Sequence, residues 1–145
     1  KYGVLNEREL ASRYEVYLEQ YELSVSVEAR SVLEVATTVV LPAAMRYQSE
    51  LAATAANLTA VGIEADTTIL GAVTSAISEL VAATAALGAV LSHEHEGSTY
   101  AGAAHAGASF LPAMDEVRAA ADTLETLVAD DLWPLPTYQE MLFIL

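Results

Sequence analysis

The chain of 145 residues has the length of one ordinary domain, and its twenty acidic and six basic residues give it a formal charge of −14. This charge repels the phosphates of nucleic acids and of anionic membranes, so neither is an expected partner. The absence of cysteine excludes disulfides, thiolate metal sites and a cysteine nucleophile, and it fits a reducing compartment. The chain starts at Lys1 without a leader pattern, which favours a piece of a longer reading frame over a secreted precursor.

The spacing of apolar residues predicts helices over nearly the whole chain, and Asn6 is placed to cap the first. Glu9 and Arg13 are spaced as an i,i+4 ion pair on its outer side. One face of this helix carries apolar residues at steps of three and four: Leu10, Tyr14, Tyr17, Leu18 and Tyr21. Three tyrosines on one stripe predict that this face packs against a partner.

The β-branched stretch LSVSV, residues 23–27, predicts a break, after which Ser26 caps a second helix that runs to about Leu58. Gly62 fits a left-handed cap at its end, and Asp66 fits the start of the third helix. The second helix is expected to bury Val32, Val35, Val39, Ala43, Tyr47 and Leu51. The third helix has a narrow seam, typical of helices packed nearly parallel or antiparallel, formed by Leu70, Val73, Ile77, Leu80, Thr84, Leu87 and Leu91.

Residues 69–91 are long and apolar enough to span a bilayer. However, alanine, serine, threonine and glycine are abundant in this stretch, and Glu79 lies near its middle. No lysine or arginine lies between Arg46 and Arg118 to set an orientation in a membrane. We therefore expect a buried helix of a soluble bundle and no membrane contact.

A fourth helix is expected from about Thr99 to about Asp131. Its first turns, YAGAAHAGA, hold two glycines and are expected either to fray or to pack very closely against a neighbour. Pro42 and Pro112 both lie in the sequence Leu-Pro-Ala and predict a kink or an interruption in their helices. The fourth helix is expected to bury Phe110, Met114, Val117, Ala121, Leu124 and Val128.

The fold class that follows is all-α: a bundle of about four long helices, two with internal prolines, plus a short C-terminal helix. That short helix belongs to the segment LWPLPTYQEMLF, residues 132–143, in which Pro134 and Pro136 end the fourth helix. Thr137 and Glu140 then form a capping box. The side chains of Tyr138, Met141, Leu142 and Phe143 are too apolar to remain in water, so the tail is expected to dock on its own bundle or on another domain or subunit.

The residues give little sign of catalytic chemistry. HEHE, residues 93–96, together with His105, has ligand types that suit zinc, but the i,i+2 spacing of His93 and His95 puts them on different faces of a helix, and a solvated loop is the simpler interpretation. No glycine-rich phosphate loop and no G-x-S-x-G elbow occur. We therefore assign no catalytic, cofactor-binding or metal-binding residue.

Three stretches carry a resemblance to a known family: SRYEVYLEQYELSVSVEA (12–29), VLPAAMRYQSELA (40–52) and FLPAMDEVRAAADTLETLVADDLWPLPTYQEMLF (110–143). In order and spacing they resemble the C-terminal region of type III glutamine synthetases. The resemblance implies an ATP-dependent ligase that joins ammonia to glutamate through γ-glutamyl phosphate with Mg or Mn. It also implies a dodecamer of two hexameric rings and a cytoplasmic enzyme.

In the family, the catalytic motifs lie upstream of this region, and none of them occurs in residues 1–145. The resemblance therefore implies a structural or subunit-contacting segment, which we divide into three parts. Residues 1–23 form a helix that belongs to the end of an upstream catalytic domain, residues 24–131 form the helical bundle, and residues 132–145 form a docked tail.

The expected partners are the upstream catalytic domain and like subunits. The side chains expected to support docking are Trp133, Pro134, Pro136, Tyr138 and Phe143, together with the helix prolines Pro42 and Pro112. Alanine at both Trp133 and Phe143 should loosen the tail or the assembly. The alternative is an independent acidic helical module for interaction or regulation, without catalysis.

Overall fold

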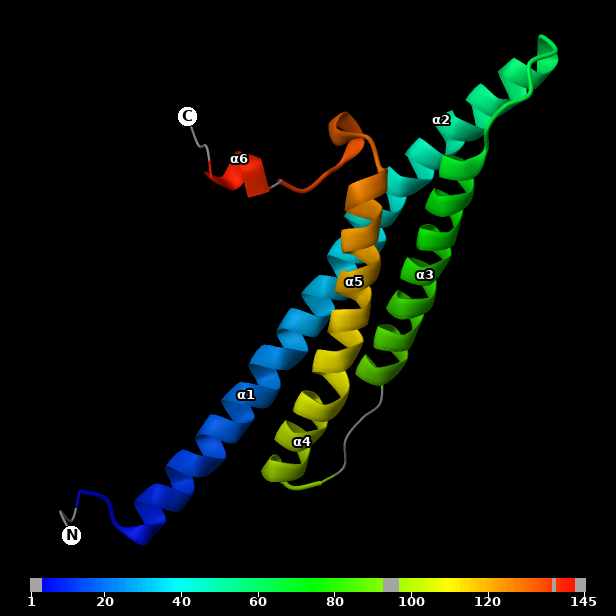
Figure 1. The fold of residues 1–145 in the computed structure, drawn as a ribbon. Helices are drawn as coiled ribbons and strands as arrows, with labels where there is room; N and C mark the ends of the chain where they lie inside the picture. Colours follow the sequence, from blue (N-terminus) through cyan, green and yellow to red (C-terminus); the bar gives the residue numbers. More distant parts are fainter. Residues whose placement is uncertain (1–3, 93–96, 137, 143–145) are drawn as a thin grey trace.

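A computed structural model describes residues 4–92, 97–136 and 138–142 of the chain, and this part consists of helices and their connections, with no strand. The elements, in chain order, are α1 (Glu7–Val35), the π turn η1 (Ala36–Val40), α2 (Leu41–Ala60), α3 (Thr68–Leu91), α4 (Thr99–His105), the π turn η2 (Ala106–Phe110), α5 (Leu111–Leu127), the 3₁₀ turn η3 (Asp130–Leu132) and α6 (Tyr138–Leu142). Figure 1 shows their arrangement, which confirms the all-α fold class and the short C-terminal helix.

The first two predicted helices form one rod of 54 residues, here called the long helix, which comprises α1, η1 and α2. The predicted break at residues 23–27, with its cap at Ser26, is therefore wrong. Val25 and Ala29 are buried in the core, so tertiary packing holds this β-branched stretch in helical form despite its lower helix propensity. The Asn6 cap is confirmed, because its side chain accepts the amide of Glu9 at 2.9 Å. In return, the backbone amide of Asn6 donates to the Glu9 carboxylate.

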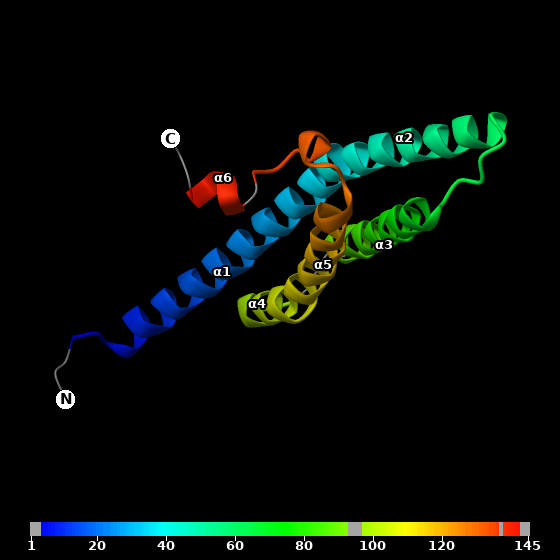
Figure 2. The ribbon, with the colours of Figure 1, turned by 45° about the horizontal axis from the view of Figure 1, so that its top comes forward.

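Both Leu-Pro-Ala sequences directly follow a π turn. The Leu41 amide donates to the Ala36 carbonyl, an i→i−5 bond that widens the turn just before Pro42. η2 holds the same place before Pro112. Because proline has no amide hydrogen to donate, a widened turn accommodates it without an interruption of the helix. Figure 2 shows the direction of the long helix changing between α1 and α2.

A tight connection returns the chain from α2 into α3. Gly62 has φ 81°, and its amide donates to Thr59 while the amide of Ile63 donates to Leu58, which is the predicted left-handed cap. The carboxylate of Asp66 accepts the Thr68 amide at 2.9 Å at the start of α3. Hydrogen bonds from the side chain and backbone of Thr68 lower the pKa of Asp66, because they stabilise its ionised form.

The seam predicted on α3 is confirmed. Val73, Leu80, Thr84 and Leu87 are buried, and the Thr84 hydroxyl donates to the Leu80 carbonyl at 2.9 Å. α3 packs along α5 on one side and along α2 on the other. The Gln48 side chain also donates to the Thr74 hydroxyl at 2.8 Å, which links α2 to α3.

The fourth predicted helix forms a second rod, which comprises α4, η2 and α5. Its glycine-rich start packs closely against α1 rather than fraying. A Cβ at Gly102 would collide with the carboxylate of Glu22, and one at Gly107 would lie 3.1 Å from the Tyr21 hydroxyl. The rod ends at Leu127, four residues before the predicted Asp131. Val128 takes an extended conformation there, and its side chain enters the core.

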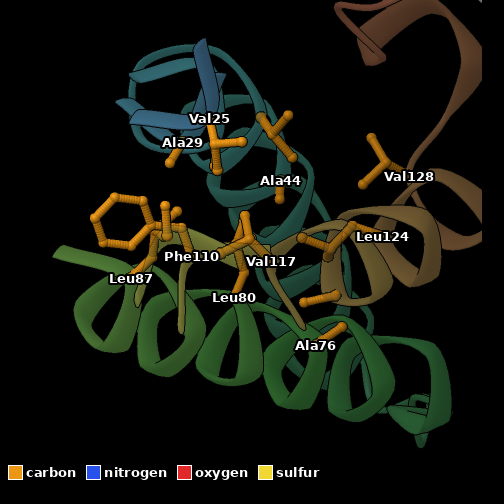
Figure 3. Packing of buried hydrophobic residues seen from close by; sticks show 14 residues of the cluster. Val25, Ala29, Ala44, Ala76, Leu80, Leu87, Phe110, Val117, Leu124 and Val128 are labelled. Carbon is orange, nitrogen blue, oxygen red and sulfur yellow. The ribbon is translucent and has the colours of Figure 1, made fainter. Parts of the chain in front are cut away.

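The core forms where α1 and η1, α3, and η2 and α5 meet. Figure 3 shows the labelled side chains of these elements converging. The side chains below 2% exposure include Leu80, Leu87, Leu124, Val40, Val73 and Val117. The long helix extends beyond this core at its N-terminal end, and no other element lies beside it there in Figure 1 or Figure 2.

Candidate functional site

Ionisable side chains do not gather into a chemical site in the part of the chain that the structure describes. No group of three His, Asp or Glu side chains there lies close enough to hold a metal ion. The acids spread over the outer faces of the helices, and the ion pair found in this part, Arg118 with Asp122 at 3.6 Å, is an exposed pair one turn apart. The predicted loop His93–Glu96 lies outside the described residues.

His105 ends α4 and takes part in helix packing. Its Nδ1 lies 3.3 Å from the Ser109 hydroxyl, and its ring meets the Phe110 ring edge to face, with centroids 5.5 Å apart. Phe110 belongs to the buried core. This arrangement holds the imidazole inside the bundle, where it has the role of a core histidine rather than that of an exposed ligand.

The first part of the C-terminal tail is seated on the bundle. The amide of Trp133 donates to the carbonyls of Ala129 and Asp130, which closes the turn η3. The side chains of Leu132, Trp133 and Leu135 are partly buried and pack against the core cluster. Apolar burial therefore anchors the tail on its own bundle up to Leu135.

Leu135 also lines an apolar groove of about 280 Å³ between the long helix and α5. Val32, Val35 and Val40 contribute from the long helix, and Val117 and Ala121 contribute from α5. The side chain of Leu135 covers part of an apolar surface that would otherwise face water.

The prolines among the docking candidates do not share this seat. Pro134 and Pro136 are exposed, and so are Pro42 and Pro112 on their rods. α6 begins at Tyr138, and its residues Met141 and Leu142 are exposed by 50% and 76%. In Figures 1 and 2, α6 stands apart from the bundle. Phe143 and Thr137 lie outside the described residues, so docking through Phe143 stays a prediction.

The N-terminal part of α1 carries the other apolar surface that the bundle does not cover. Here this part, residues 7–23, is called the arm. Its tyrosine stripe, defined as Leu10, Tyr14, Tyr17 and Tyr21, is exposed along its length, and Tyr17 is exposed by 66%. Sequence spacing predicted this stripe but not its place beyond the bundle.

A second exposed row on α1 was not recognised in the sequence. Val16, Leu23 and Val27 are each at least half exposed and lie at steps of seven and four, which places them on one face of the helix. Helical periodicity could have revealed this row. The tyrosines and the break expected at residues 23–27 obscured it. The arm therefore presents apolar side chains on more than one face.

α3 is long and apolar enough to cross a membrane, judged by length and composition, with a mean hydropathy of 1.6 over its best window. In the structure it lies between α2 and α5, and its buried residues are Val73, Ala76, Leu80, Thr84 and Leu87. Of that window 22% is buried, so α3 buries one face, whereas the sequence predicted a buried helix. The expectation of no membrane contact stays a prediction.

Comparison with known proteins gives a family for the chain. Residues 1–59 match the family model described as glutamine synthetase C-terminal domain. The type-3 glutamine synthetase of Dictyostelium discoideum is 30% identical over 98% of this chain, and the glutamine synthetase of Bacteroides fragilis is 30% identical over 97% of it. That of Butyrivibrio fibrisolvens is 28% identical over the whole chain. No solved structure matches the chain significantly.

The similarity extends over both ends of the chain, including the seated tail and the exposed arm. The chain spans about a fifth of the length of these relatives, 20% for the first two and 21% for the third. The matched family model describes a domain at the C-terminal end of glutamine synthetases. The chain therefore belongs to the type III glutamine synthetase family, in which it corresponds to the C-terminal domain.

Proposed function

We propose that this chain is the non-catalytic helical domain of an enzyme that makes glutamine from glutamate, ammonia and ATP through γ-glutamyl phosphate. The observation that carries the proposal is the similarity of nearly the whole chain to three glutamine synthetases, each about five times longer. The chain matches about a fifth of each relative, and the match extends to both of its ends. It therefore corresponds to a domain with a defined place in the larger protein.

The residues of this chain do not fit the cofactors that such an enzyme needs. ATP and Mg or Mn require converging carboxylates and a cradle for phosphates. The described part of the chain gathers no such carboxylates, and the sequence holds no glycine-rich phosphate loop. In the proposed enzyme, ATP and the metal bind upstream of this domain, and no step of the reaction passes through its side chains.

The proposed role of the domain is to hold the enzyme together. Its partners are the upstream catalytic domain and like subunits, in a dodecamer as the family resemblance implies, and its compartment is the cytoplasm. Exposed apolar side chains on the arm and on α6 support a role in contacts, because large exposed apolar patches mark interaction sites. The charge of −14 supports a role that involves neither nucleic acid nor anionic membrane.

The test compares the complete reading-frame product with a version that stops before Ser24. Glutamine formation that depends on ATP, ammonia and glutamate is measured for both, together with the mass of each assembly. We expect activity and a large assembly for the complete product. We expect both to be lost on truncation, because subunit contacts hold active sites in shape.

The contrary result would be a complete product that makes no glutamine while its helical segment still folds. In that case the independent acidic module is the better interpretation, and its function is interaction without catalysis. An active truncated enzyme with an unchanged mass would leave the ligase in place and remove the assembly role of this domain.

A further inference from the structure

The arm is a helix that projects from the bundle with large side chains in water. It begins with the capping box at Asn6, which satisfies amides of its first turn. Between residues 7 and 24, only Leu18 and Glu22 are even partly buried. Leu10 and the three exposed tyrosines follow at steps of four, three and four, and they form one continuous face, which has the width of a helix packing seam.

Charge is distributed unevenly between the arm and the bundle. Three of the six basic residues of the chain lie within the first thirteen positions, namely Lys1, Arg8 and Arg13. By contrast, the part after residue 63 holds twelve of the twenty acidic residues and one basic residue, Arg118. The arm itself, residues 7–23, nevertheless holds five glutamates and two arginines, so a neighbour that offers basic groups suits it better than a second acidic copy.

We infer that the tyrosine stripe of the arm docks on the domain that precedes this chain in the same polypeptide. The inference rests on the proposed function, because the relatives extend for about four fifths of their length beyond the matched region. In a C-terminal domain, that preceding part joins at the foot of the arm. A neighbour tethered at this point has a high effective concentration, so it covers the stripe without a large interface.

A second copy of this chain is the less favourable occupant. Two copies that met along their arms would bring together two bundles whose α3–α5 halves are strongly acidic. Such like charges raise the free energy of the pair, and salt screens them only in part. A preceding domain avoids this repulsion, because its surface has a different sequence and can be complementary to the arm.

The experiment compares tyrosine nitration by tetranitromethane in the 145-residue chain and in the complete polypeptide. Tyr17 and the control Tyr100 on α4 are matched, with exposures of 66% and 63%. In the 145-residue chain, both should react at similar rates. In the complete polypeptide, Tyr14 and Tyr17 should react at least about tenfold more slowly, because the core of an interface excludes solvent, while Tyr100 keeps its rate.

A pair of variants tests whether the stripe itself makes the contact. In the complete polypeptide, Tyr14→Ser with Tyr17→Ser should speed hydrogen exchange of the amides in residues 8–22. Tyr100→Ser should leave that exchange unchanged. Both variants change exposed side chains of this domain, so its core stays folded, and amide protection around Leu80 verifies this.

Each outcome separates this inference from the proposed function. Equal nitration of Tyr17 in both contexts overturns the inference, even if the polypeptide makes glutamine. Protection already present in the 145-residue chain, which rises with concentration and accompanies a dimeric mass, also overturns it and assigns the stripe to a second copy. Protection confined to the complete polypeptide supports the docking, even where glutamine formation fails and the enzyme proposal falls.

Discussion

At the scale of single residues, small side chains decide how closely the rods approach. Ala29, Ala43, Ala44 and Ala106 are fully buried, so much of the core consists of methyl groups. Gly102 lets α1 come so close that the Glu22 carboxylate occupies the place of a Cβ. Gly71, on α3, faces open space. These two helical glycines therefore have opposite roles in the stability of the domain.

Substitution of the two glycines by alanine should separate these roles. Gly71→Ala should raise the free energy of unfolding by about 0.5 to 1 kcal/mol, because alanine favours the helix and loses less entropy on folding. Gly102→Ala should give no such gain, because the Glu22 side chain must move out of its partly buried place. Urea denaturation measures both values.

The control for Gly102 is a double-mutant cycle. In a Glu22→Ala background, Gly102→Ala should recover a gain similar to that of Gly71→Ala, since the three atoms nearest to the added methyl group all belong to Glu22. If Gly102→Ala stabilises the domain equally in both backgrounds, the close approach of α1 and α4 does not limit this position.

At the scale of elements, the two π turns set the rotation of each rod after its proline. The first and last residues of each turn are buried: Ala36 and Val40 in η1, and Ala106 and Phe110 in η2. An α-helical turn that kept all five residues would instead rotate everything beyond it by roughly 100°. Ala44 would then leave its buried place.

Insertion of one alanine after Thr38 should therefore destabilise the domain by about 3 kcal/mol or more, in the range of core disruption, because it adds such a rotation to α2. Thr38 is itself exposed, and its hydroxyl donates to the Glu34 carbonyl at 2.7 Å. The substitution Thr38→Ala keeps the length of the turn and should cost no more than about 0.5 kcal/mol. Equal denaturation midpoints for the insertion and the substitution would show that the length of η1 does not set the register of α2.

At the scale of the whole molecule, stability is concentrated in the middle of the long helix. α3 and α5 pack on it there, whereas all side chains of the arm before Leu18 are exposed. Isolated helical segments of this length are marginal in water, so the arm depends on its cap and on the helix that follows it. The 145-residue chain should therefore open locally at its arm far more often than at its core.

Native-state hydrogen exchange tests this gradient in the 145-residue chain. Amides of residues 8–20 should exchange within about tenfold of peptide rates, because opening the arm costs little free energy. Amides around Leu80 and Leu124, both fully buried, should exchange only through global unfolding. A dilution series provides the control, and arm protection equal to that of Leu80 at every concentration would contradict the gradient.

The sequence by itself determined the all-α class, the Asn6 and Gly62 caps, the seam on α3 and the buried residues of α5, because periodicity and capping are local properties. The resemblance to the family also followed from sequence. Only the tertiary structure decided that α1 and α2 are one rod, because burial of Val25 and Ala29 outweighs the local preference of residues 23–27. The tertiary structure also decided which apolar stripe meets the core and which remains in water. The spacing of apolar residues predicts that a face is buried, but it does not show which element covers that face. The tyrosine stripe of the arm and the seam of α3 have similar patterns, and only the placement of the other rods distinguishes them.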